Sequence, residues 1–209
     1  MVSSPVGYVT MANTSRPYHH GDLERAVIDG AVDEVQTEGI AGVSMRRIAR
    51  RAGVSHAAIA YRFGDKTGVF TAVATEGFRL QADMLRSSAN GVDDFLRGGQ
   101  AYITFALAHP GYFEVMFRPY LYRGDDPSLL DAKGAAFEVL SGTARASLGE
   151  HAGEEEVSAL ALAGWCMSHG FATLALTSNI LELRNADPIA VAEKIRTGTV
   201  ALGKLAAKL

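Results

Sequence analysis

Six cationic side chains gather between residues 44 and 66, in the segment SMRRIARRAGVSHAAIAYRFGDK. They are Arg46, Arg47, Arg50, Arg51, Arg62 and Lys66. Asp65 is the one carboxylate in this segment, so its net charge is +5, whereas the whole chain has a net charge of −3. Guanidinium and ammonium groups bind phosphate oxygens, and a basic cluster in a mildly acidic protein indicates a polyanionic partner.

The same segment is predicted to form two short helices joined by a tight turn. Ser44 and Ser55 are suited to cap these helices, because a serine oxygen accepts a free N–H group at a helix start. Gly53 can take the left-handed conformation that ends the first helix. The short distance between caps is that of a helix-turn-helix. Apolar residues recur at the spacing of one helix face, namely Met45, Ile48 and Ala49, then Ala58, Ile59 and Phe63.

The outer side of the second helix is predicted to suit close approach to DNA. It would present His56, Ala57, Ala60, Tyr61 and Arg62. Small side chains let a helix backbone come near the base edges in a major groove about 12 Å wide. His56 and Tyr61 can reach bases or phosphates, while Arg62 and Lys66 lie at the far end, where phosphate contact is expected. A solvated basic hairpin is the alternative interpretation.

A supporting helix is predicted from Asp22 to Glu38, with Asp22 as its N-cap. Its apolar stripe is Leu23, Ala26, Val27, Gly30, Ala31 and Val35. Six carboxylates against Arg25 make this helix acidic, so we expect that face to point away from DNA. Residues 39–42, with Ile40 buried as a plug, would link it to Ser44.

Two regions resemble a known family. The stretch YHHGDLERAVIDGAVDEVQTEGIAGVSMRRIARRAGVSHAAIAYRFGDKTGVFTAV resembles the N-terminal DNA-binding domain of TetR-family transcriptional regulators. Its matching marks are the first-helix stripe, EGI, Ser44 with the Ile48-Ala49 pair, AGVS, and Phe63 with Asp65-Lys66. The stretches HPGYFEVMFRPYL and WCMSHGFATLAL look like the C-terminal domain of the branch with a Trp-His-Gly signature, which would be Trp165, His169 and Gly170.

The resemblance implies DNA-binding roles for matching positions. Ser44 would contact a phosphate, and Arg46 would contact a base or a phosphate. His56 and Ala57 would lie against base edges, and the DNA backbone would be bound by Tyr61, Arg62 and Lys66. Many members have Tyr where this chain has Ala60 and His where it has Arg62, and here the aromatic residue is one place later.

Composition and charge divide the chain. Residues 1–15 are expected to form a flexible arm, 16–66 the helix-turn-helix domain and 67–209 a helical ligand-binding and dimerisation domain. Residues 1–66 carry a net charge of +1 and residues 67–209 carry −4, so the second part should not hold DNA. Arg16, His19 and His20 could touch DNA from the arm, with a merely disordered terminus as the alternative. Cys166 is the only cysteine, which excludes an intramolecular disulfide and favours a reducing cytoplasm.

The second part is expected to be helical throughout, which makes the fold class all-α. Caps and prolines predict helices from Asp65 to about Asn90 and from Val92 to His109. Further helices are predicted to start at Pro110, Asp126-Pro127, near Gly153 and at Asp187-Pro188.

Residues 157–181 contain no Asp, Glu, Lys or Arg, so a membrane span is one alternative. Several hydroxyl-bearing residues and a flank of three glutamates without a basic anchor favour a helix buried in protein instead. The resemblance implies a homodimer formed by the last two long helices, and Ala161, Gly164 and Ser168 are spaced for close approach. A dimer would bring two recognition helices to half-sites roughly 34–36 Å apart or a multiple of that.

Aromatic residues of the second part could line a ligand cavity. The candidates are Tyr102, Phe105, Phe113, Phe117, Trp165 and His169, with Tyr112 and Tyr120 as further aromatics. Ordinary core packing is the competing interpretation of all of them. The resemblance implies a small, fairly apolar effector that releases a repressor from a palindromic double-stranded DNA operator.

Two other functions compete with this interpretation. An enzyme is disfavoured because the chain has no G-x-S-x-G, Walker, Rossmann or H-E-x-x-H pattern. Cys166 and His169 are one turn apart, but a buried apolar helix does not suit a catalytic thiolate. No cofactor or metal is predicted. A sequence-tolerant architectural DNA binder is the other alternative, against which the acidic second part argues.

Overall fold

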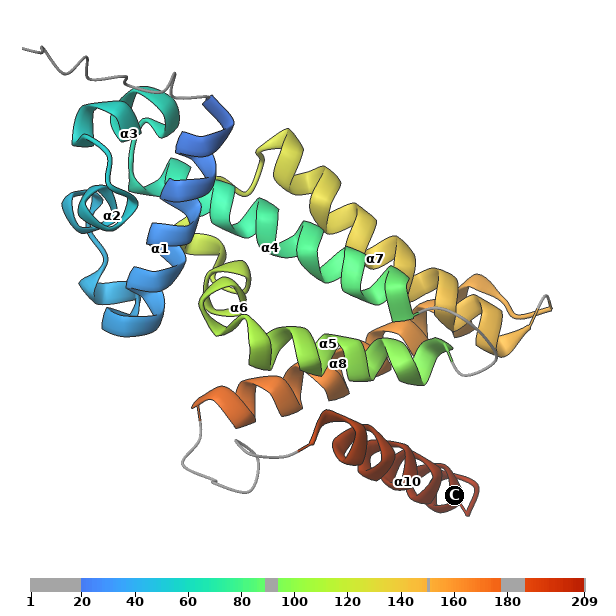
Figure 1. Cartoon of the computed structure of the whole chain (residues 1–209). Helices are drawn as coiled ribbons and strands as arrows, with labels where there is room; N and C mark the ends of the chain where they lie inside the picture. The colour runs from blue at the N-terminus through green and yellow to red at the C-terminus, as the bar shows by residue number, and fades with distance from the viewer. Residues whose placement is uncertain (1–19, 89–93, 150, 178–186, 209) are drawn as a thin grey trace, which may run out of the picture.

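The computed structural model describes residues 20–88, 94–149, 151–177 and 187–208, and the regular elements within them are all helical (Figure 1). The all-α prediction is therefore confirmed. The N-terminal unit consists of α1 (His20–Gly42), α2 (Met45–Ala52) and α3 (His56–Phe63), which gather at one end of the molecule. The arm of residues 1–15, together with Arg16 and His19, lies outside the described residues.

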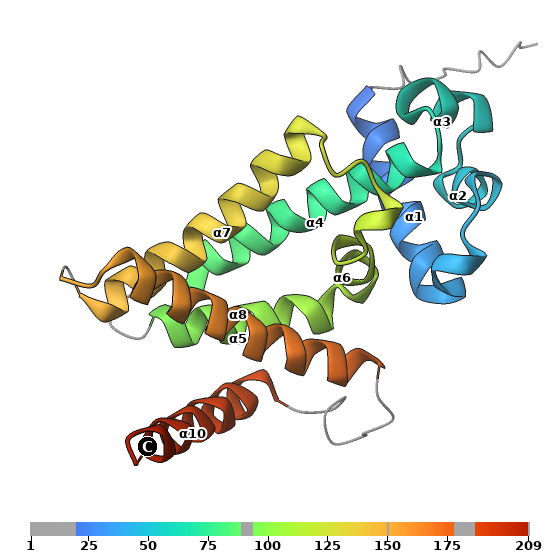
Figure 2. The ribbon, with the colours of Figure 1, turned by 180° about the vertical axis from the view of Figure 1, so that it is seen from behind.

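A long helix, α4, leads from this unit into a larger helical domain. Its elements are α4 (Lys66–Ser88), α5 (Asp94–Ala108), α6 (Pro110–Met116), η1 (Pro119–Leu121), α7 (Pro127–Leu148), α8 (Glu154–Thr177) and α10 (Pro188–Ala206). Helix α4 packs against α7, and α5 packs between α4 and α8. Helix α10 packs against α5, and Figure 2 shows it beside the α5–α8 pair.

Side-chain caps fix the helix starts where the sequence predicted them. Asp65 Oδ1 accepts the Gly68 N–H at 2.8 Å, and Asp126 Oδ1 accepts the Leu129 N–H at 3.1 Å. Asp187 likewise caps α10. Prediction failed at Asp22, which lies within α1 and is not its cap, because the helix extends back to His20. The short 3-10 turn of η1 was also not anticipated.

Helix α1 is interrupted where the linker was expected. Gly39 has φ 68° and ψ 167°, a conformation that residues with a β-carbon disfavour. The regular helix therefore ends at Glu38, and Ile40 then packs partly buried against the core. This break turns the chain towards Ser44.

One hydrophobic core runs through both parts of the molecule. Helix α4 supplies Val69 and Phe70 next to the helix-turn-helix, and Phe78 and Leu85 further along. The buried side chains joined in this way include Val27, Val35, Ile48, Ile59, Phe63, Phe105, Met116 and Leu129. Because α4 packs in the core of both parts, a displacement of that helix would move the N-terminal unit.

Helices α8 and α10 each leave an apolar face uncovered. Exposed side chains are Leu162, Leu174, Ile189, Val200, Leu202 and Leu205, between 50% and 64% accessible. Cys166, also on α8, is exposed in the single chain, so its expected burial would require a partner that covers this helix.

By length and composition alone, α8 is the one helix within the described ranges that could cross a membrane. Helices that pack inside proteins meet the same criterion. Its contacts with α5 and α7 show that part of its surface packs on this chain.

Candidate nucleic-acid interface and ligand cavity

The helix-turn-helix is closed by the caps that the sequence predicted. Ser44 Oγ accepts the Arg47 N–H at 3.4 Å, and Ser55 Oγ accepts the Ala58 N–H at 3.1 Å. Gly53, with φ 66°, ends α2, and its N–H donates to backbone carbonyls of that helix. Ile48, Ile59 and Phe63 are buried. Burial of this face fixes which residues of α2 and α3 remain outside.

The outer surface presents most of the predicted DNA-contacting residues. Ser44, Arg46, His56, Ala57, Tyr61 and Arg62 are all exposed, and Lys66 is partly buried. Tyr61 is 92% accessible, an unusual state for a large aromatic side chain. Ala60, which was expected to face outward, is only partly exposed.

Two of the six cations point inward and bind the acidic supporting helix. Arg47 Nε and Arg51 Nε each donate to a carboxylate oxygen of Glu34 at 2.6 Å, and Glu34 is only 1% accessible. Burial acts to raise the pKa of Glu34, but the hydrogen bonds from both arginines outweigh it and hold that pKa below its ordinary value. Arg47 also pairs with Glu38. Part of the acidic side of α1 therefore packs against the basic hairpin, a contact that the sequence did not predict, and the orientation of the remaining carboxylates away from DNA stays a prediction.

Two further cations are also engaged within the protein. Arg62 Nη2 lies 2.5 Å from Glu24 Oε2 in an exposed ion pair. Lys66 Nζ donates to the Val43 carbonyl at 3.1 Å and lies 5.6 Å from the centroid of the Phe70 ring. Of the six, Arg46 and Arg50 alone form no ion pair or side-chain hydrogen bond with any described residue. Fewer cations are therefore available to bind a partner than the six that the sequence contains.

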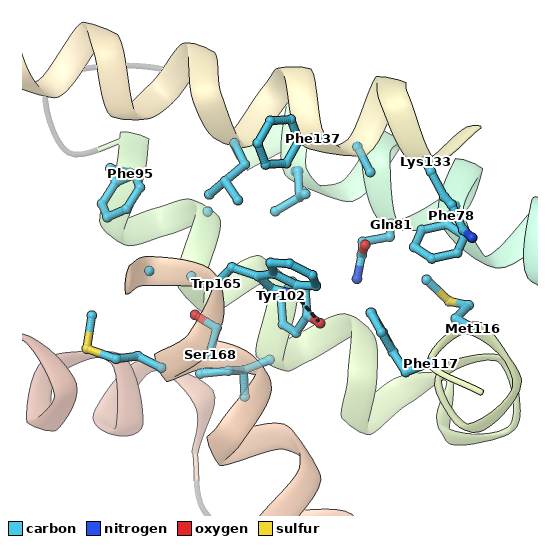
Figure 3. Close-up of a pocket in the computed structure, with 18 of the residues that line it drawn as sticks. Phe78, Gln81, Phe95, Tyr102, Met116, Phe117, Lys133, Phe137, Trp165 and Ser168 are labelled. Atoms are coloured by element: carbon cyan, nitrogen blue, oxygen red, sulfur yellow. Dashed lines mark hydrogen bonds between the residues drawn. The ribbon is translucent and has the colours of Figure 1, made fainter. Parts of the chain in front are cut away.

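A cavity of about 480 Å³ lies in the larger domain (Figure 3). Its walls come mainly from α4, α5, α7 and α8, with contributions from α6, η1 and α10. The lining is largely apolar: Phe78, Leu85, Phe95, Leu96, Ile103, Met116, Phe117, Phe137, Leu140, Met167 and Ile195. Volume and polarity are those of a small-molecule site.

Three of the six predicted ligand residues line this cavity, namely Tyr102, Phe117 and Trp165. Phe105 and Phe113 are buried behind the wall. His169 also lies behind it, where its ring packs 4.4 Å from Phe117, centroid to centroid. Ordinary core packing, the competing interpretation, is therefore correct for three of the six predicted ligand residues.

A polar chain runs through the wall. Trp165 Nε1 donates to the Tyr102 hydroxyl at 3.3 Å, and that hydroxyl lies 2.8 Å from His169 Nδ1. Burial raises the pKa of Tyr102 above its ordinary value, while the Trp165 and Gln81 side chains oppose this shift. Burial lowers the pKa of His169. All three side chains are therefore uncharged near neutral pH.

Sequence reasoning did not assign Gln81, Lys133 or Ser168 to the cavity, and it placed Ser168 in the dimer contact only. Gln81 is 3% accessible and sits among apolar residues of α4, an interruption that the sequence displays. Lys133 comes from α7, and nothing in the sequence distinguishes it from a solvated surface lysine. Figure 3 shows Gln81 and Lys133 at the same end of the cavity as Phe78.

The described residues form an all-helical protein with an N-terminal helix-turn-helix and a larger helical domain that holds a cavity. Residues 27–73 match the family described as bacterial regulatory proteins, tetR family, and residues 95–196 match the tetracyclin repressor-like C-terminal domain. The chain belongs to the TetR family. No curated protein matches the chain.

Solved structures share the fold of this chain. A protein with unknown function from Rhodococcus sp. RHA1 is 28% identical, with 86% of this chain and 98% of that chain covered and a TM-score of 0.66. A bacterial regulatory protein in the tetR family from Rhodococcus RHA1 is 15% identical, covering 83% and 92%, with a TM-score of 0.65. The TetR family transcriptional regulator PfmR from Thermus thermophilus is 15% identical, covering 82% and 90%, with a TM-score of 0.57.

Proposed function

We propose that this DNA-binding regulator is a cytoplasmic repressor that leaves a palindromic operator when a small molecule occupies its cavity. The observation that carries the DNA-binding role is that Arg46 and Arg50 of α2 and His56 and Tyr61 of α3 are all exposed. Arg46 and Arg50 supply charge for phosphates, and His56 and Tyr61 supply hydrogen-bonding groups for bases or phosphates. Ala57 permits close approach, and Ser44, Arg62 and Lys66 would hold the flanking backbone.

A homodimer through α8 and α10 is part of this proposal. Their uncovered faces carry Leu162, Leu174, Val200, Leu202 and Leu205, and exposed apolar surface of this extent is typical of a protein interface. A symmetric dimer doubles the number of bases read, which matters because each mismatch costs only about 1–3 kcal/mol. We keep residue 66 as the proposed boundary between the DNA-binding and dimerisation domains.

The loop before α7 offers a route from the cavity to the DNA-binding unit. Tyr122 lines the cavity, and the next residue, Arg123, pairs through Nη2 with Asp65 Oδ1 at 2.9 Å. The Arg123 N–H also donates to Thr71 Oγ1 of α4 at 3.0 Å. Asp65 caps α4 immediately after α3. A ligand that displaces Tyr122 would thereby shift α4 and change the spacing of the two recognition helices.

Selection of DNA from a random pool by the purified protein, at near-physiological salt, tests the proposal. An enriched palindrome with half-sites about one helical turn or more apart supports a dimeric operator-binding regulator. No enrichment, with flat affinity across sequences, would instead favour the architectural DNA binder.

A further inference from the structure

The cavity contains one charged side chain among its described lining residues, Lys133. Its Nζ lies 4.8 Å from the centroid of the Tyr122 ring and 5.6 Å from that of Phe78. No carboxylate lines the cavity within the described part of the chain, and Lys133 belongs to none of the ion pairs formed there. Aromatic faces attract a cation but leave its N–H donors without acceptors.

A second polar group in the cavity also lacks a partner. Gln81 is 97% buried and its side chain lies near enough to the Tyr102 hydroxyl to lower the pKa of that group, but its Nε2 makes no hydrogen bond of normal length and angle within the described structure. A buried donor left without an acceptor is costly, so such groups are rare in folded proteins. Gln81 and Lys133 therefore both offer N–H groups to whatever occupies this end of the cavity.

The tyrosine hydroxyls of the wall do not compete for that role. Tyr102 OH already accepts from Trp165 and contacts His169, and Tyr122 OH donates to the Met116 carbonyl at 2.8 Å. The single O–H donor of Tyr122 is therefore used within the protein, and the Tyr102 hydroxyl already has two partners there. The donors at the Phe78 end of the cavity are therefore Gln81 Nε2 of α4 and Lys133 Nζ of α7, and Ser168 of α8 is a further hydroxyl-bearing residue of the lining.

We propose that the effector is amphipathic, with a single anionic group that pairs with Lys133 Nζ and accepts a hydrogen bond from Gln81 Nε2. The uncharged body of this ligand fills the apolar remainder of the cavity. The inference rests on the proposed ligand-binding role of this domain and specifies the ligand's chemistry.

The distribution of side chains supports one anion at one end. Lys133, Gln81 and Phe78 lie together in Figure 3, and Phe95 lies at the opposite end of the cavity. A second charge on the ligand would be buried without a counter-ion, which is strongly unfavourable. Burial lowers the pKa of Lys133 below its ordinary value, and an anionic partner would restore it.

A matched pair of fluorescent probes tests the proposal on the full-length protein. The probes are 1-anilinonaphthalene-8-sulfonate and its uncharged counterpart N-phenyl-1-naphthylamine, which share one aromatic framework. Trp165 is the only tryptophan and lines the cavity, so energy transfer from it reports probe bound in the neighbourhood of the cavity. We expect the sulfonate to bind about tenfold more tightly than the uncharged probe, the scale of one charge-assisted hydrogen bond.

Substitutions of Lys133 test whether its positive charge causes the preference for the sulfonate probe. Lys133→Met and Lys133→Gln should abolish the preference for the sulfonate, and Lys133→Arg should keep it. Lys208→Met, which removes an exposed charge outside the cavity lining, should also keep it. Equal affinities in the wild type, or a preference that survives in both Lys133→Met and Lys133→Gln, would overturn the anion proposal and leave the cavity as a ligand site. Energy transfer from neither probe would overturn the ligand-binding role itself.

Discussion

Most cations of the helix-turn-helix are bound within the protein, whereas the one cation that lines the cavity has no ion-pair partner among the described residues. In the helix-turn-helix, Arg47 and Arg51 are held by the buried Glu34, and Arg62 is held by Glu24. In the cavity, Lys133 has aromatic rings around it but no carboxylate among the described lining residues. Paired cations organise a surface, and unpaired ones are free to bind a partner.

The presence or absence of an ion-pair partner distinguishes cations that the sequence alone does not distinguish. Of the cations in the basic segment, Arg46 and Arg50 resemble Lys133 in having no ion-pair partner within the described residues. We therefore expect substitutions at unpaired groups to change binding and substitutions at paired groups to change stability.

The largest effect is expected for the double substitution Arg46→Ala with Arg50→Ala. Loss of two charge-assisted phosphate contacts should weaken operator binding by roughly 100-fold and reduce the salt slope by about two. The melting temperature should barely change, because both side chains are exposed. Electrophoretic mobility shift at several salt concentrations measures the binding.

The matched control for that pair is Arg79→Ala with Arg97→Ala, which removes two exposed charges from the larger domain. Its operator affinity should stay close to that of the wild type. Full operator affinity in the Arg46/Arg50 variant would contradict the proposed interface.

The next largest effect is expected for Glu34→Gln, which tests whether the paired arginines contribute to stability. An amide can accept from one arginine but turns its own N–H groups towards the other, so we expect a loss of about 1.5–3 kcal/mol. Thermal unfolding checks this. Asp33→Asn is the control, since its exposed carboxylate is 3.9 Å from Arg51 and should contribute little.

The pH dependence of this effect has a definite sign. Because the folded-state pKa of Glu34 lies below 4.5, its stabilisation is full above that pH and declines as the pH falls through the lowered value. The gap in stability between the wild type and Glu34→Gln should therefore shrink in acid. A constant gap would show that the carboxylate charge is not its source.

Sequence patterns located the elements because the signals are local. Serine and aspartate caps, Gly53 and the prolines act within one helical turn, so Ser44, Asp65, Asp126 and Asp187 could be assigned correctly. Pairing across elements is not local. The distance from Arg47 to Glu34 depends on how α2 crosses α1, and the environment of Lys133 depends on α4 and α7 together. Aromatic content therefore pointed to the cavity domain but not to its polar groups.

A smaller effect is expected for Gln81→Met. Replacing a buried amide that lacks a partner with an apolar side chain of similar length should stabilise the ligand-free protein by about 1 kcal/mol. The same change should weaken binding of the sulfonate probe and leave the uncharged probe unaffected. Thermal unfolding with both probes separates these effects, and lower stability with unchanged probe binding would show that the amide belongs to the fold alone.

The smallest effect is expected for Arg62→Ala. To bind a phosphate, Arg62 must leave Glu24, so the phosphate interaction is offset by the loss of an exposed ion pair, which itself contributes at most about 1 kcal/mol. Operator affinity should fall less than tenfold, and the salt slope by less than one. Glu24→Gln should act in the opposite direction and strengthen binding, since it frees Arg62 beforehand. If Arg62→Ala instead matched the Arg46/Arg50 variant, a paired cation would bind DNA as well as an unpaired one.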